Sequence, residues 1–172
     1  MKNTDTREKI LELLFVYPLK SFNLREISRL IDISVPSVSR FLKELETENL
    51  IFINKRKYLY EIKANIDNTK FKDLKRVFNF SSLYESGFVD YLREKFSLNT
   101  VILFGSYSKG YDSEKSDIDV AVIGNEKELN LEKFEKKLNR KINIEFIKMN
   151  KISNELKNSL INGIILNGYM EA

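Results

Sequence analysis

Two aspartates at alternate positions stand where a buried β-strand is predicted to begin, and they restrict how this chain can fold. Residues 118–123 are apolar except for Asp119, and Asp117 comes directly before them. Because side chains alternate between the faces of a strand, we expect Asp117 and Asp119 to point one way and Ile118 and Val120 to point into a core. Two neighbouring carboxylates repel each other unless a cation lies between them, and Mg²⁺ prefers oxygen ligands. The pattern therefore predicts a divalent metal site.

An earlier apolar run, residues 100–104, is also predicted to be a buried strand, and it ends at Gly105 and Ser106. Glycine lets the backbone approach a ligand closely, and a helix after the turn would direct free N–H groups at an anion. The turn therefore predicts a phosphate site. Asp-x-Asp is also common in solvated turns, and Gly-Ser alone is a simple loop. Neither alternative explains two aspartates on one face of an otherwise buried strand.

The spacing of these residues resembles the nucleotidyltransferase superfamily of DNA polymerase β, especially its minimal, stand-alone branch. That signature is an apolar residue before Gly-Ser, a spacer of roughly ten residues, and Asp-x-Asp between apolar residues. Here it reads Phe104-Gly105-Ser106 and Asp117-Ile118-Asp119-Val120. Lys109 and Gly110 stand where the branch commonly has a basic residue and a second glycine, whereas Tyr107 replaces a frequent arginine.

The resemblance implies a role for each of these positions. Asp117 and Asp119 would hold two Mg²⁺ ions, and Glu145, within the β-type run of residues 143–147, would complete the metal site or take the proton of the attacking hydroxyl. The residues implied in nucleotide binding are Gly105, Ser106, Lys109 and Gly110. The implied reaction transfers a nucleoside monophosphate from a nucleoside triphosphate, with ATP the expected donor, to a hydroxyl acceptor. In the minimal branch the acceptor can be a side chain of an all-helical toxin, which makes such enzymes antitoxins.

Composition removes several other classes of site. The 172 residues include no cysteine and no histidine, which excludes disulfides, zinc–thiolate sites and Ser-His or Cys-His catalysis. With 42% hydrophobic and 31% charged residues, the chain is expected to be globular. Residues 1–12 lack an apolar signal core, and no run is long enough to span a membrane, so we expect a cytoplasmic protein.

The first third of the chain has the order of elements typical of a winged helix-turn-helix domain. Apolar spacing predicts helices over residues 6–15, 24–31 and 35–48, the second capped by Asn23 and the third by Ser34. Two β-type runs, residues 50–53 and 58–62, follow as a basic hairpin. In that fold the third helix enters the DNA major groove and the hairpin tip contacts phosphates.

The net charge of +4 does not by itself indicate nucleic acid, although most of the excess falls within residues 1–63. The expected DNA-binding residues are Ser37, Ser39, Arg40 and Lys43 on the third helix, with Lys55, Arg56 and Lys57 at the hairpin tip. Two other interpretations remain open: the basic residues form a solvated turn, or the domain docks a protein.

Together these patterns predict an α+β chain. It would have a winged helix-turn-helix domain over residues 1–64, a connector helix over 65–80 and a small nucleotidyltransferase domain with a mixed sheet over 81–172. A stripe of apolar residues in the connector is expected at a homodimer or interdomain interface; it comprises Phe71, Leu74, Val77 and Phe78. The alternative function is a DNA-binding regulator whose second domain only binds nucleotide.

Overall fold

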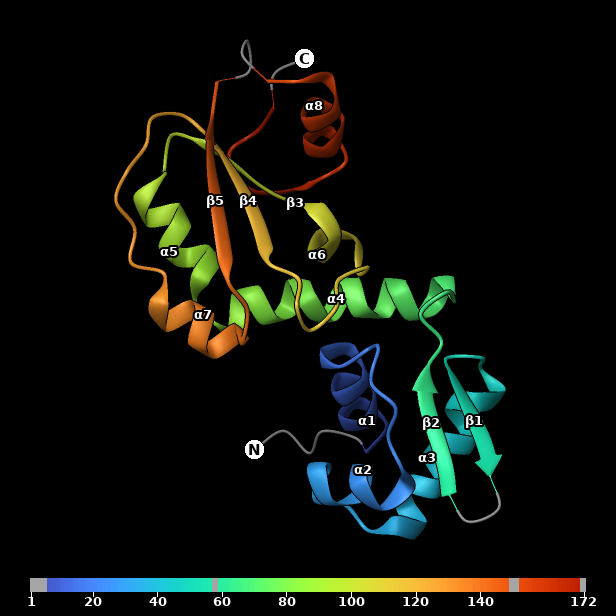
Figure 1. The fold of residues 1–172 in the computed structure, drawn as a ribbon. Helices are drawn as coiled ribbons and strands as arrows, with labels where there is room; N and C mark the ends of the chain where they lie inside the picture. Colours follow the sequence, from blue (N-terminus) through green and yellow to red (C-terminus); the bar gives the residue numbers. More distant parts are fainter. Residues whose placement is uncertain (1–5, 57–58, 149–151, 171–172) are drawn as a thin grey trace. The chain divides into compact units, whose positions relative to one another are not determined.

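The computed structural model describes residues 6–56, 59–148 and 152–170, and the chain divides into two compact units, residues 1–75 and 76–172 (Figure 1). No helix in the described ranges is both long and apolar enough to cross a membrane.

The first unit is three helices followed by a two-stranded antiparallel hairpin. Its elements are α1 (Thr6–Val16), α2 (Leu24–Ile31), α3 (Val35–Thr47), β1 (Ile51–Arg56) and β2 (Leu59–Ala64). Phe22, before α2, adds an isolated antiparallel bridge to Ile62 of β2. The three predicted helices and both strands are therefore confirmed, with the strands extending further than their apolar cores.

Local chemistry explains the turn between α2 and α3. The Asn23 side chain accepts a hydrogen bond from the Glu26 N–H at 2.8 Å, and the Glu26 carboxylate accepts one from the Asn23 N–H, which is a capping box. Asp32 ends α2 in the left-handed conformation with φ 54°, so the chain turns at once into α3. The buried side chains of the three helices and hairpin form one core: Ile10, Leu14, Ile27, Val38, Leu42, Leu45, Leu50, Ile51 and Ile62.

Glu48 joins distant segments of the first unit at the end of α3. Its carboxylate lies 2.6 Å from Lys70 Nζ and 3.1 Å from Arg7 Nη2. The hydrogen bond from Lys70 is the main reason that the pKa of Glu48 is lowered, and Arg7 lowers this pKa further. The two cations compensate for placing a negative charge at a helix C-terminus.

Helix α4 (Thr69–Glu85) does not present its predicted apolar stripe as one surface. Phe71 is buried, with its ring centroid 5.1 Å from that of Phe15, so it belongs to the core of the first unit. Val77 is 68% exposed, and Leu74 and Phe78 are half-buried. The stripe separates because the two units divide this helix between residues 75 and 76.

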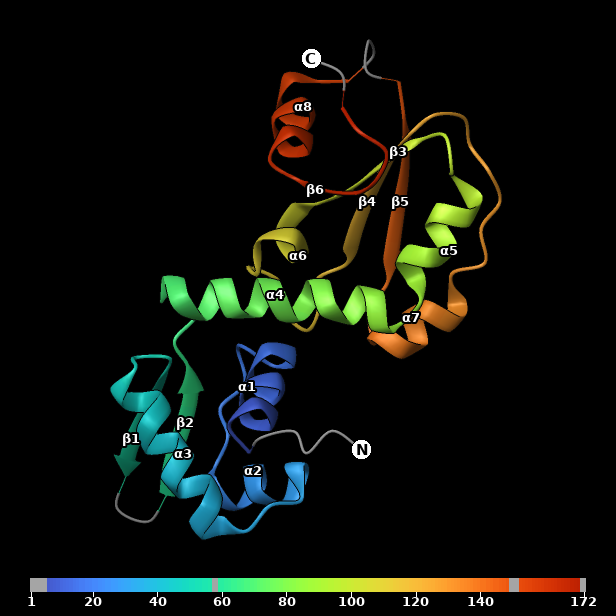
Figure 2. The ribbon, with the colours of Figure 1, turned by 180° about the vertical axis from the view of Figure 1, so that it is seen from behind.

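The second unit is built on a mixed four-stranded sheet. The remaining elements are α5 (Phe88–Lys95), β3 (Thr100–Phe104), α6 (Gly105–Lys109), β4 (Ile118–Ile123), α7 (Glu132–Leu138), β5 (Ile142–Ile147), α8 (Asn154–Ile161) and β6 (Ile164–Asn167). The strand order is β5-β4-β3-β6, with β4 parallel to β5 and β3 antiparallel to both of its neighbours (Figures 1 and 2). The expected mixed sheet in an α+β chain is confirmed.

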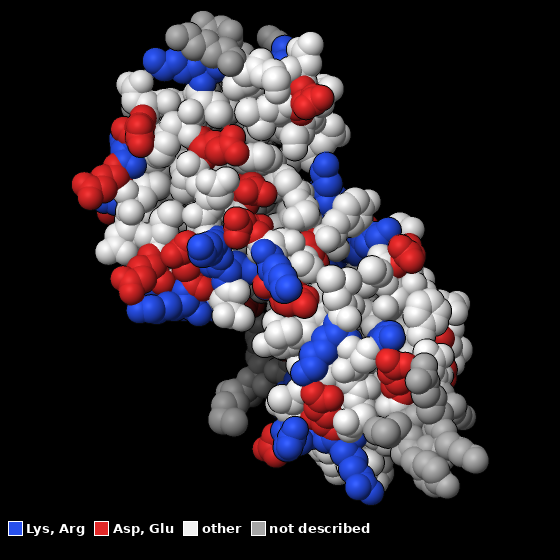
Figure 3. Space-filling view, in the orientation of Figure 1, with Lys and Arg blue, Asp and Glu red and all other residues white. Residues whose placement is uncertain are grey.

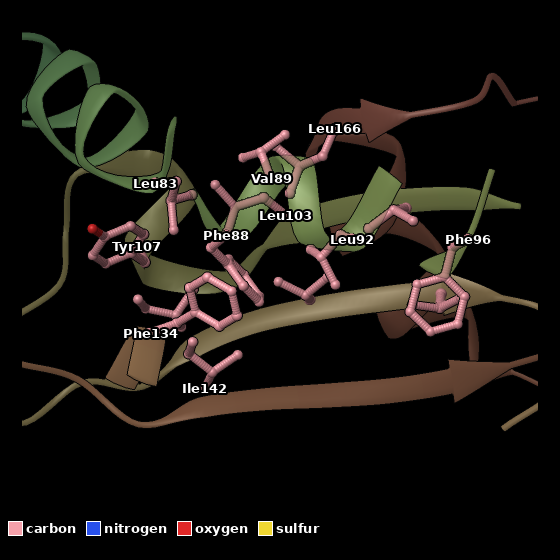
Figure 4. Packing of buried hydrophobic residues seen from close by; sticks show 14 residues of the cluster. Leu83, Phe88, Val89, Leu92, Phe96, Leu103, Tyr107, Phe134, Ile142 and Leu166 are labelled. Atoms are coloured by element: carbon pink, nitrogen blue, oxygen red, sulfur yellow. The ribbon is translucent and has the colours of Figure 1, made fainter. Parts of the chain in front are cut away.

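Each face of the sheet has its own apolar core. On one face, Val101, Leu103, Val120 and Val122 pack against α5 and α7 through aromatic side chains that include Phe88 and Phe134 (Figure 4). On the other face, a smaller cluster joins the sheet to α8: Ile102, Phe104, Ala121, Ile147 and Leu160. The alternation of side chains along β4 therefore places Asp119 on the α8 face, opposite in direction to Val120.

A buried polar network fixes the segment between α6 and β4. Asp112, almost fully buried, accepts a hydrogen bond from Asn79 Nδ2 at 2.7 Å and lies 3.6 Å from the Arg140 guanidinium. Asn79 also donates to the Tyr107 carbonyl, and the Tyr107 hydroxyl donates to the Asn79 carbonyl. Burial, and then the charge of Asp112, raises the pKa of Tyr107 above its usual range. No local sequence pattern predicts this network, which holds Tyr107 and Asp112 near the start of the segment that leads to Asp117.

Helix α7 begins later than expected. Apolar spacing predicts a helix over residues 129–138, but α7 starts at Glu132. Leu129 and Leu131 lie in a non-helical segment and pack, half-buried, against the core. Their apolar spacing therefore reflects this packing and does not mark a helix.

We expect Glu48→Gln to lower the free energy of unfolding of the first unit by roughly 0.5 kcal/mol at pH 7, since it removes a partly exposed charge network. Because the folded-state pKa of Glu48 is lowered, its contribution is present above the unfolded-state pKa and is lost as the pH falls through the folded-state pKa. Urea unfolding should show a larger difference between Glu48→Gln and the wild type at pH 7 than at pH 3. Glu44→Gln, at an exposed position of the same helix, is the control; an equal loss at both pH values would contradict this prediction.

We expect Arg140→Met to destabilise the second unit by roughly 3 kcal/mol, because the buried Asp112 carboxylate loses its ion-pair partner. Adding Asp112→Asn should recover part of the loss by removing the buried charge. Hydrogen exchange of the β4 amides, measured for both variants, reports on this unit alone. A double variant that is less stable than Arg140→Met would show that the charge is not the cause.

Candidate functional site

The turn after β3 brings the Gly-Ser pair directly against Asp119. Gly105 has φ 75°, a conformation that side chains disfavour, and a Cβ placed on it would lie 2.5 Å from Asp119 Oδ2. In the pairing of β3 with β4, Phe104 lies opposite Asp119. Gly105, the next residue, therefore lies beside the Asp119 side chain. Residue 105 must therefore be glycine for two reasons, its backbone conformation and its closeness to Asp119. The Gly-Ser turn and the Asp119 carboxylate form one site.

The other residues of the turn differ in their accessibility. Ser106 is half-exposed in the first turn of α6, and Lys109 is exposed at its end. Gly110 caps α6 in the left-handed conformation with φ 72°, and its N–H donates to the Ser106 and Tyr107 carbonyls. Tyr107, which replaces the frequent arginine, is buried in the core. Ser106 and Lys109 are thus the accessible polar side chains of this turn.

On the side of β4 away from β3, the neighbour of Asp119 is Asn143 of β5. The parallel register pairs Asp119 with Asn143 of β5, and Asn143 Nδ2 donates to Asp119 Oδ1 at 3.4 Å. Asn143 is exposed and lies on an edge strand of the sheet, whereas Asp119 is half-buried. Sequence analysis did not identify Asn143, although it occupies the first polar position of the same β-type run as Glu145.

Asp117 lies outside the strand. It is exposed one residue before β4 and lines a shallow hollow of about 540 Å³. The other lining residues are mostly charged: Glu114, Lys115, Ser116, Glu132, Glu135, Lys136, Asn139, Arg140 and Lys141. Asp117 and Asp119 therefore have different neighbours, one among the side chains of α7 and the loop before β4, the other at the Gly-Ser turn.

Glu145 is half-buried and pairs with Ala121, two residues further along β4 than Asp119. It shares the face of Asp119 but does not lie opposite it. Within the described ranges, no three acidic, histidine or cysteine side chains gather closely enough to hold a metal ion. Figure 3 shows acidic side chains over this region of the sheet, with basic side chains beside them.

The expected DNA-binding residues of α3 differ in their exposure. Arg40 and Lys43 are exposed, with the Arg40 guanidinium 4.5 Å from the centroid of the Phe41 ring, while Ser37 and Ser39 are half-buried. Ser39 and Lys43 line a hollow of about 370 Å³ beside the hairpin, together with Leu24, Leu42, Glu46, Ile53, Tyr60 and Ile62. The side chains of Lys55 and Arg56, and Lys57 as a whole, lie outside the described residues.

Basic charge is not concentrated on the visible side of the first unit. Figure 3 shows Lys and Arg interspersed with Asp and Glu there.

Comparison with known proteins finds one similarity, which lies within the second unit. Residues 88–170 match the family model described as "Polymerase beta, Nucleotidyltransferase". The match spans the strands β3, β4, β5 and β6, and with them the Gly-Ser turn, Asp117, Asp119 and Glu145. No curated protein and no solved structure matches the chain. Residues 88–170 are thus similar to the nucleotidyltransferase domains that this family model describes.

Proposed function

We propose that this chain is a Mg²⁺-dependent nucleotidyltransferase that moves a nucleoside monophosphate, AMP in the first instance, to a hydroxyl acceptor. The observation that carries the proposal is the close approach of the Gly105 backbone to the Asp119 carboxylate. A phosphate-binding turn and a metal-binding carboxylate must be adjacent if one metal–triphosphate complex is to bind both. A Gly-Ser loop unrelated to Asp119 would require no such contact.

The donor atoms suit the metal. Asp119 and Asn143, which lie side by side, would offer a carboxylate and an amide oxygen, and Asp117, two residues before Asp119, would offer a second carboxylate. Mg²⁺ prefers such oxygen ligands and commonly takes one or two carboxylates plus substrate phosphates. When bound, the metal neutralises the phosphate charge that grows during transfer. Ser106 would hydrogen-bond the phosphates, with Gly105 and Gly110 allowing the backbone to approach, and exposed Lys109 would supply a counter-charge.

The proposed transfer is a single displacement. The acceptor oxygen attacks the α-phosphorus, a new oxygen–phosphorus bond forms, and the bond from the α-phosphorus to the oxygen bridging to the β-phosphate breaks, so that pyrophosphate leaves. Glu145, the remaining carboxylate on the Asp119 face, would accept the proton of the acceptor directly or through one water.

The first unit suggests that the transferase is tethered to a DNA-binding domain. Its order of elements, with α3 following a tight turn and exposing Arg40 and Lys43, is consistent with a winged helix-turn-helix domain on duplex DNA. We propose a homodimeric regulator that modifies a partner protein, as an antitoxin modifies a helical toxin.

The second candidate is a regulator whose nucleotidyltransferase domain binds nucleotide without transferring it. One observation favours it: within the described ranges, no group of three potential metal ligands is assembled from acidic, histidine or cysteine side chains. Both candidates require nucleotide binding, and they differ in whether a covalent product forms.

We expect Asp119→Asn to weaken Mg²⁺–ATP binding at least tenfold, because the carboxylate between the turn and Asn143 is lost. Isothermal calorimetry measures the affinity, and the full chain with α-³²P-ATP and candidate acceptors measures transfer. Asp90→Asn, an exposed aspartate of α5, is the control. Unchanged affinity in Asp119→Asn would overturn the site; binding without any labelled product, across protein and nucleic-acid acceptors, would favour the second candidate.

We expect Arg40→Ala to weaken binding to a cognate duplex roughly tenfold and to reduce the salt dependence if the side chain contacts phosphate. Gel shifts over a salt series, on duplexes selected from a random pool, provide the measurement. Lys136→Ala, an exposed cation of the second unit, removes the same charge elsewhere. If no duplex is retained at low salt, the first unit is a protein-docking domain.

A further inference from the structure

The register of β4 and β5 determines which side chain completes the proposed metal site. Asp119 is paired with Phe104 on one side and with Asn143 on the other. Glu145 is paired with Ala121, two residues further along. At about 3.3 Å of rise per residue, that offset is about 6.6 Å along the strand. The side chain nearest the Asp119 carboxylate across the sheet is therefore an amide.

The amide changes the electrostatics of the site. Two facing carboxylates would repel each other and require a cation, whereas Asn143 donates its Nδ2 hydrogen to Asp119 Oδ1 across 3.4 Å. This pair is satisfied without metal. Rotating the same amide about its terminal torsion would exchange the donor for Oδ1, which is an acceptable Mg²⁺ ligand.

We infer that Asn143, and not Glu145, is the third protein ligand position of this site, and that its neutral amide makes the site bind a metal–triphosphate complex rather than free metal. The inference rests on the proposed function in one respect, that the site binds a divalent metal with nucleotide. Affinity for a divalent ion rises with the number of charged ligands, so a neutral ligand leaves part of the charge to the triphosphate. Because β5 is an edge strand and Asn143 is exposed, the triphosphate has an open approach.

Three variants of the full chain distinguish the role of Asn143 from that of Glu145. Asn143→Asp should raise the affinity for free Mn²⁺, measured by electron paramagnetic resonance without nucleotide, at least tenfold. It should also lower Tm in a chelator, with Mg²⁺ restoring the loss. Asn143→Ala should weaken Mg²⁺–ATP binding severalfold, with no such dependence of Tm on the metal. Glu145→Gln should leave both free Mn²⁺ binding and Mg²⁺–ATP affinity unchanged.

Two results would overturn the inference. One is a loss of Mn²⁺ or Mg²⁺–ATP binding in Glu145→Gln that equals the loss in Asp119→Asn. The other is an Asn143→Asp variant that folds with unchanged Mn²⁺ affinity. If Asn143→Asp fails to fold even with Mg²⁺ present, the comparison of Asn143→Ala with Glu145→Gln decides.

If the proposed function is wrong, the same measurements give a different set of results. In that case wild-type protein and Asp119→Asn bind Mg²⁺–ATP equally poorly, while Asn143→Asp still gains affinity for free Mn²⁺ because that measurement needs no nucleotide.

Discussion

The functional site of the second unit depends on one close contact, between the Gly105 backbone and the Asp119 carboxylate. Any side chain at residue 105 would overlap Asp119 Oδ2 and would also adopt a disfavoured backbone conformation. This contact exists because β3 and β4 are antiparallel neighbours, so the end of one strand meets the beginning of the other. The apolar cores on the two faces hold these strands in place, and the site at their end follows from that packing.

The loop from Gly110 to Asp117 is held by a turn of its own, in which the Ser116 N–H donates to the Ser113 carbonyl, and by contacts of Asp112 to other segments. Asp112 binds Asn79 of α4 and Arg140, which comes just after α7, so segments far apart in the sequence set the position of one loop. A charge this deeply buried is stable only with hydrogen bonds and a counter-charge, and here it has both. These contacts join the loop that carries Asp117 to α4 and to the segment after α7.

Much of the architecture was predictable because strong local signals decide it. Thr100–Phe104 and Ile118–Ile123 are apolar runs bounded by turn residues, and the structure has strands over the same residues. The adjacency of Gly105 and Asp119 follows once those strands pair. The parallel register of β4 and β5 was not predictable, since the connection through α7 allows slips of two residues without exposing an apolar face. Glu145 was selected because it is an acid, and Asn143 was missed because nothing local distinguishes it. The residues Asn79, Asp112 and Arg140 were missed for a related reason: isolated polar residues show no periodicity, and only tertiary contacts reveal their burial.

Helix α4 has a consequence for how the protein can be divided. Its first turns supply Phe71 to the core of the first unit, and Asn79, further along, serves the polar network of the second. A fragment ending at residue 75 would keep only the first two turns of this helix, well below the roughly 12 residues at which an isolated helix becomes marginally stable. A fragment beginning at residue 76 would start inside the helix, close to the residue that binds Asp112. Neither unit can be excised cleanly at the boundary between them, so fragments for separate study should each retain the whole of residues 69–85.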